Sequence, residues 1–150
     1  MSGPNVPNPG DSLTSRRRLV YILVLGALTA LGPFTVDMYL PAFPVLESDF
    51  GVDATVVQLT LTGTMVGFAV GQLFVGPLSD RVGRRYPLVI GTGIHVLASI
   101  GIALAPSIAV VGTLRVLQGF GAAAGGVVAM ATVRDLFAGR ALVRMLCRMA

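Results

Sequence analysis

Long uncharged apolar runs limit what this chain can fold into more than any other feature. The run from Ala54 to Leu78 holds 25 residues without a charged side chain, and the run from Leu19 to Val36 holds 18. About 20 such residues in a helix cross a bilayer. Only 12% of the residues are charged, about half the share found in a soluble domain, and the mean hydropathy is +0.81. We therefore predict an all-α polytopic membrane protein.

Four spans and the start of a fifth are expected. Residues 1–18 are rich in Pro, Gly, Asn and Ser and are expected to form a disordered cytoplasmic tail. The first span should continue past Asp37 as an irregular helix, because three prolines remove backbone donors, and an acidic loop should follow it at Glu47, Asp49 and Asp53. Glycines at helical spacing in the second span should let another helix approach closely, at Gly63, Gly67, Gly71 and Gly76. The spans are expected at about 19–46, 54–78, 87–105 and 108–132, with a truncated fifth from about 140.

The arginines are distributed unevenly between the segments outside the spans. Three lie in the tail, none in the first connection, three in the second, none in the third and four after Thr132. Because cytoplasmic segments carry the excess of Arg and Lys, the N-terminus and the 76–85 connection are predicted to be cytoplasmic. The net charge of +4 is better explained by orientation in a membrane than by nucleic acid. We expect membrane lipid, and no nucleic acid, as a partner.

The end of the chain carries arginines at every fourth position, at Arg140, Arg144 and Arg148. This pattern suits an amphipathic helix on the membrane surface or, as we prefer, the cytoplasmic approach to a fifth span beyond the chain. The single cysteine, Cys147, excludes an internal disulfide. Because the sequence offers neither a metal cluster nor a nucleophile–base pair, we expect no metal, no cofactor and no enzyme activity.

Three groups of residues carry a family resemblance. A charged turn after the second span reads Gly76-Pro77-Leu78-Ser79-Asp80-Arg81-Val82-Gly83-Arg84-Arg85, and it resembles the signature loop of the major facilitator superfamily. The fourth span contains Leu114-Arg115-x-x-Gln118-Gly119-x-Gly121-Ala122-Ala123, which resembles the fourth-helix motif of its drug/proton antiporters. Two further segments resemble the Bcr/CflA drug-resistance group of this superfamily. They are Val36-Asp37-Met38-Tyr39-Leu40-Pro41-Ala42 and Val133-Arg134-Asp135-Leu136-Phe137.

The resemblance implies a part of a multidrug/proton antiporter of the bacterial cytoplasmic (inner) membrane. The complete protein would extrude small amphipathic, drug-like compounds by alternating access between two six-helix halves, driven by the proton gradient and without a cofactor. This chain would supply about one third of it, would lack the C-terminal half as its partner, and is expected to be inactive alone. Two alternatives are a self-sufficient four-helix exporter that dimerises and a non-transporting remnant of a broken gene.

Two residues inside the spans carry a charge, Asp37 and Arg115, and their signs are opposite. Such groups cost about 2.5–3.5 kcal/mol or more and usually face a cavity and a partner. Asp37 lies about 15 Å before Glu47, and Arg115 about 12 Å after Ser107, so their depths in the membrane are similar. We hypothesise that Asp37 binds and releases the coupling proton and that Arg115 biases its pKa. The alternative is a static ion pair between two buried charges.

The neighbouring polar residues carry further expectations. Gln118 lies on the same helix face as Arg115 and either orients the guanidinium or contacts substrate, or it makes an ordinary interhelical hydrogen bond. His95 is expected to serve packing or to be exposed rather than to relay protons. By the family resemblance, the turn is a conformational latch formed by Gly76, Asp80, Arg81, Gly83, Arg84, Arg85 and Asp135.

Within that latch, Gly76 should allow close helix approach and Gly83 a tight turn. Asp80 should face the N-terminus of a helix from the missing half, where the helix dipole favours a negative charge, and Arg84 should reach Asp135. In the alternative interpretation, Arg81, Arg84 and Arg85 only enforce topology and contact anionic lipid.

Overall fold

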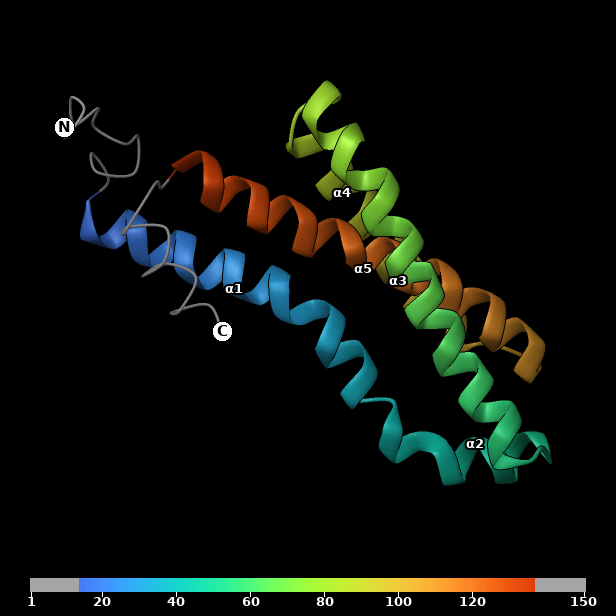
Figure 1. Ribbon diagram of the computed structural model, residues 1–150. Coiled ribbons are helices and arrows are strands. Elements are labelled where there is room, and N and C mark those ends of the chain that lie inside the picture. The colour runs from blue at the N-terminus through green and yellow to red at the C-terminus, as the bar shows by residue number, and fades with distance from the viewer. Residues whose placement is uncertain (1–13, 137–150) are drawn as a thin grey trace, which may run out of the picture.

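The computed structural model describes residues 14–136, and every regular element in that part of the chain is a helix (Figure 1). Four helices are long and apolar enough to cross a membrane. The predicted all-α fold with four spans is therefore confirmed. The elements are α1 (Ser15–Asp37), the short 3₁₀ helix η2 (Leu40–Ala42), α2 (Phe43–Phe50), α3 (Ala54–Val82), α4 (Arg85–Ala103) and α5 (Ile108–Leu136).

The first span differs from the prediction at both ends. Helix α1 already begins at Ser15, so the arginines at 16–18 belong to its first turn and not to a tail. It ends at Asp37, and the chain continues through η2 into α2, where Pro41 and Pro44 lie in first turns that tolerate proline. The expected acidic loop is wrong for residues 47 and 49, which belong to α2, and right for Asp53, which lies in the connection before α3. The expected fifth span, and the tail before residue 14, lie outside the described residues.

The turn predicted over residues 76–85 is mostly helical. Helix α3 continues to Val82, and only Gly83 and Arg84 separate it from α4. The helix ends there because Gly83 has φ 88° and ψ 159°, a region of backbone conformation that is essentially restricted to glycine. The tight turn expected at Gly83 is confirmed. The charged residues before it therefore stand on a helix.

Helix α5 is the centre of the bundle. It packs most extensively against α3, then against α4 and then against α1. In its most apolar stretch 56% of the residues are buried, against 11% in the first span. Small side chains make this possible, since its fully buried residues include Ala123, Ala124 and Ala129. A helix lined with alanine lets several neighbours approach it at once.

Glycines bring α3 and α5 into backbone contact. A methyl group added at Gly71 would lie 2.7 Å from the Phe120 carbonyl oxygen, and one added at Gly67 would strike the carbonyl oxygen of Val116. The predicted close approach is confirmed at these two positions. It is wrong at Gly76, where an added methyl would meet no atom of another described helix within 4 Å. Gly76 instead lines the cleft described below.

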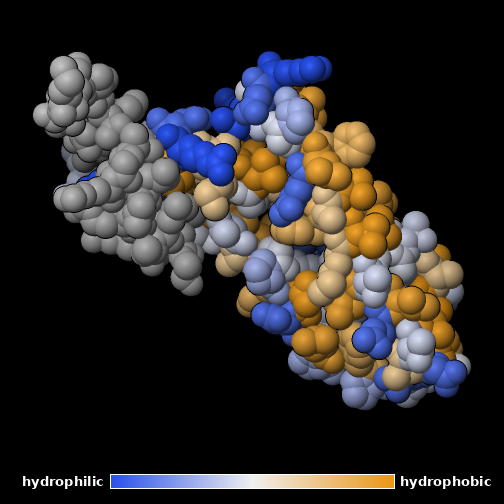
Figure 2. All heavy atoms as spheres, viewed as in Figure 1, coloured by the Kyte–Doolittle hydropathy of each residue, from blue (hydrophilic) through white to orange (hydrophobic). Residues whose placement is uncertain are grey.

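The outside of the bundle is apolar. Large hydrophobic side chains are exposed on every long helix, among them Leu23, Leu73, Leu97 and Leu117. Such side chains cover much of the face that α3 presents in Figure 2. Helices α1 and α3 come together near α2 and separate toward their other ends (Figure 1). We call these the α2 end and the Arg84 end of the bundle.

Candidate functional site

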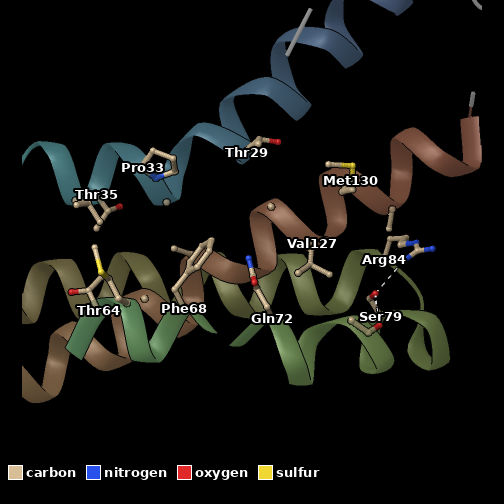
Figure 3. Close-up of a pocket in the computed structure, with 18 of the residues that line it drawn as sticks. Thr29, Pro33, Thr35, Thr64, Phe68, Gln72, Ser79, Arg84, Val127 and Met130 are labelled. Atoms are coloured by element: carbon tan, nitrogen blue, oxygen red, sulfur yellow. Dashed lines mark hydrogen bonds between the residues drawn. The ribbon is translucent and has the colours of Figure 1, made fainter. Parts of the chain in front are cut away.

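A cleft of about 840 Å³ lies between α1, α3 and α5 and reaches the Arg84 end. Figure 3 shows Phe68 and Gln72 pointing from α3 into the space below Thr29 and Pro33 of α1. Small residues of α5 leave the cleft deep, including Gly119, Ala122 and Gly126. The apolar wall is formed by Pro33, Val36, Met65, Phe68, Val127 and Met130.

The polar groups in the body of the cleft are neutral. The hydroxyls of Thr29 and Thr35 donate to carbonyls of their own helix, Leu25 at 2.9 Å and Leu31 at 2.6 Å. The Gln72 amide lines the cleft and makes no hydrogen bond to another described residue. Charged side chains line only the Arg84 end. Such a cleft suits a mostly apolar molecule that carries a few hydrogen-bonding groups.

Arg84 joins the helices at this end (Figure 3). Its Nη1 lies 2.9 Å from Asp80 Oδ1, and its Nη2 and Nε each lie 3.2 Å from Asp135 Oδ2. The contact expected between Arg84 and Asp135 is therefore present. The Asp80 and Asp135 side chains are 67% and 58% exposed, so each pair contributes little by itself. The cluster matters as a connection between α3, α4 and α5.

Ser79 belongs to this cluster and was missed by sequence reasoning. It is 1% exposed; its hydroxyl donates to the Gly76 carbonyl at 2.9 Å and accepts a hydrogen bond from Arg84 Nη1 at 3.1 Å. The available signal was a small polar residue directly before Asp80 on a helix. Arg81 and Arg85 are exposed and form no ion pair with another described residue.

Arg115 is buried in the half of the bundle nearer α2. It is 6% exposed, its guanidinium carbon lies 3.4 Å from the centre of the Tyr39 ring, and its Nη1 donates to Gln118 Oε1 at 2.9 Å. Its Nε–H is buried without a hydrogen-bond acceptor. No carboxylate of residues 14–136 pairs with this cation.

Gln118 connects Arg115 to α4. Its Nε2 donates to Ser99 Oγ at 2.8 Å, and Ser99 in turn donates to the His95 carbonyl at 2.7 Å. His95 is buried, with Nδ1 3.0 Å from the Gln118 carbonyl oxygen. Gln118 thus contacts the guanidinium and also makes an interhelical hydrogen bond, and His95 is buried in the bundle rather than exposed.

Asp37 is not brought together with Arg115. It is exposed at the last residue of α1, and no ion pair joins it to any residue within 14–136. Tyr39, two positions later, occupies the face of the guanidinium instead. The proton-carrier role of Asp37 stays a prediction.

Residues 15–148 match the family model of the Major Facilitator Superfamily. The chain belongs to this superfamily. It is 48% identical over 129 residues to an uncharacterized MFS-type transporter of Bacillus subtilis, covering 86% of this chain and 32% of the relative. It is also 48% identical over 120 residues to a chloramphenicol resistance protein of Pseudomonas aeruginosa, covering 79% and 28%. A bicyclomycin resistance protein homolog of Haemophilus influenzae is 42% identical over 118 residues, covering 79% and 30%.

These relatives confirm the resemblance to the Bcr/CflA-type drug-resistance proteins. The chain spans about a third of the length of the relatives it matches. With four helices able to cross a bilayer, it is a multi-pass membrane protein of a transporter family.

Proposed function

We propose that this chain provides one wall of the substrate cavity in a transporter that exports small amphipathic compounds. The observation that carries the proposal is the cleft of about 840 Å³ between α1, α3 and α5. Its volume and its largely apolar lining with a few polar groups fit a drug-sized ligand. Relatives named for chloramphenicol and bicyclomycin resistance support the same class of substrate. The remaining wall would come from sequence corresponding to the other two thirds of these relatives, so residues 1–150 alone are not expected to transport.

Export would be coupled to protons through Asp37, Arg115 and Gln118. Asp37 precedes by two residues the ring that stacks on Arg115. A movement of this short segment changes the distance between carboxylate and guanidinium, and an opposite charge at short distance changes the proton affinity of a carboxylate. This supports a coupling role in which the two charges meet only in part of the transport cycle.

The Arg84 end would face the cytoplasm of a bacterial inner membrane, because the arginines outside the spans gather there and at the N-terminus. Its ion cluster would act as a latch with the second half of the transporter. Asp80 would make the exposed contact with the second half, and Arg84 and Asp135 would hold Asp80 in place. The remaining latch residues would complete the surface that faces the second half, at Gly76, Arg81, Gly83 and Arg85.

A chimera tests the transport proposal. Residues 1–150 are joined to the remaining two thirds of the Pseudomonas aeruginosa relative, and chloramphenicol accumulation is measured in cells. We expect cells with the chimera to accumulate less chloramphenicol than cells with the empty vector. A proton uncoupler should abolish this difference. The matched control carries Gly126→Trp, which fills the cleft floor. The proposal would be contradicted if the chimera reached the membrane in the same amount as the Pseudomonas aeruginosa relative and the cells were still as sensitive to chloramphenicol as cells with the empty vector. Resistance from residues 1–150 alone would instead favour a self-sufficient exporter.

A further inference from the structure

The buried Arg115 has an aromatic partner where an acidic one was expected. A charged side chain inside a membrane span is costly and is normally satisfied by an opposite charge or by several acceptors. Within residues 14–136, Arg115 has one hydrogen-bond acceptor, Gln118, and its remaining close partner is the Tyr39 ring at 3.4 Å. An arginine over the face of an aromatic ring is attracted by the ring's quadrupole, more strongly when both are removed from water.

Tyr39 is itself held from two further sides. It is 5% exposed, and its hydroxyl lies 2.7 Å from Thr60 Oγ1 on α3. Thr60 already donates its single hydroxyl proton to the Val57 carbonyl at 2.6 Å, so the Tyr39 hydroxyl must be the donor. The ring also packs edge-on against Phe43 of α2, with centroids 5.3 Å apart. One side chain thus connects the end of α1 with α2, α3 and α5.

We propose that Tyr39 is the positioning residue for Arg115. Its ring fixes the guanidinium, and its hydroxyl, anchored on Thr60, fixes the ring. In this arrangement Tyr39 keeps Arg115 buried, while the Asp37 carboxylate, two residues earlier, stays exposed and unpaired among the described residues. The functional meaning of this placement rests on the proposed proton coupling, but the placement itself is testable without transport.

The test is NMR spectroscopy of residues 1–150 in lipid nanodiscs, with arginine labelled at the side-chain nitrogens. The Arg115 Nε–Hε signal is assigned by its disappearance in Arg115→Lys. Because the group lies over the Tyr39 ring, its proton signal should be shifted upfield. We expect Tyr39→Leu to remove that shift and Tyr39→Phe, which keeps the ring but loses the hydroxyl anchored on Thr60, to reduce it. Tyr21→Leu and Tyr86→Leu, which remove the exposed tyrosines of α1 and α4, should leave it unchanged.

An unchanged Arg115 signal in Tyr39→Leu would overturn the proposal. If that variant does not fold, Thr60→Val decides: it keeps the ring and removes its anchor, so the upfield shift should decrease, and a full shift would refute the anchoring. Failure of the chimera to export chloramphenicol would contradict the proposed function and would leave this result untouched, so the two outcomes are distinguishable.

Discussion

Replacing Gly71 by alanine probes the contact that builds the bundle. The new methyl group would lie 2.7 Å from the Phe120 carbonyl oxygen and 2.8 Å from Ala123 Cβ. Carbon atoms in contact are about 3.5–4.0 Å apart, so α3 has to move away from α5 by roughly 0.7–1.2 Å. Neither obstacle is the end of a flexible side chain, so the helices themselves must separate.

The expected loss of stability follows from that displacement. A gap of about 0.5–1 Å already removes a quarter to a half of the attraction between two atoms, and overpacking a tight core typically costs about 1–3 kcal/mol. Alanine also favours a helix over glycine by about 0.5–1 kcal/mol, which offsets part of the cost. Gly93→Ala in α4 is the matched control, because it gains the same helix preference without bringing its new methyl group within 4 Å of a neighbouring helix.

The measurement is the unfolding of both variants in detergent micelles by increasing SDS, followed by circular dichroism. We expect Gly71→Ala to be less stable than Gly93→Ala by about 1–3 kcal/mol. Equal stabilities would show that α3 and α5 do not pack at the distance described, and the explanation of the central position of α5 would then be wrong.

Four further predictions concern single residues. Gly83→Asn should destabilise by about 1–3 kcal/mol in the same SDS titration, because its φ of 88° and ψ of 159° suit only glycine. Gly51→Asn should be tolerated there, because a φ of 60° and ψ of 40° lie in the left-handed region that asparagine adopts. Arg84→Gln should cost about 1 kcal/mol or less at low salt, and the difference should shrink in 1 M NaCl, since the pairs are partly exposed. Gln118→Leu should lower the free energy of unfolding by more, about 1–3 kcal/mol, because it leaves a buried N–H of Arg115 without its acceptor. A loss equal to that of Arg84→Gln would contradict this explanation.

The spans could be predicted from the sequence because they depend on one-dimensional properties. Length and the absence of charge suffice to place a helix in a bilayer, and small residues at helical spacing indicate where helices touch. Gly67 and Gly71 followed that rule. Gly76 did not, because spacing says which residues share a helix face but not how far along that face the neighbouring helix remains in contact.

The site was harder to predict because it depends on which side chain occupies a shared space. The sequence paired Asp37 with Arg115 by charge and depth, while the structure places Tyr39 against the guanidinium. After Asp37 the chain leaves α1 and turns through η2. Because of this turn Tyr39 points into the bundle and Asp37, two positions earlier, does not. The Arg84–Asp135 contact was easier to predict, since both residues stand at helix ends that must meet at one surface.

The divergence of α1 from α3 has a consequence for how the cleft could select its ligands. Helices α3, α4 and α5 are tied together by backbone-level contacts at Gly67, Gly91 and Gly121, whereas α1 is the least buried of the four spans. Helix α1 packs along α5, where a methyl group added at Gly125 would lie 2.9 Å from the Leu28 carbonyl oxygen, but it packs little against α3. The separation of α1 from α3 therefore sets the width of the cleft, so ligands of graded size would be accommodated by a graded rotation of α1 about its contact with α5 rather than by rebuilding the wall.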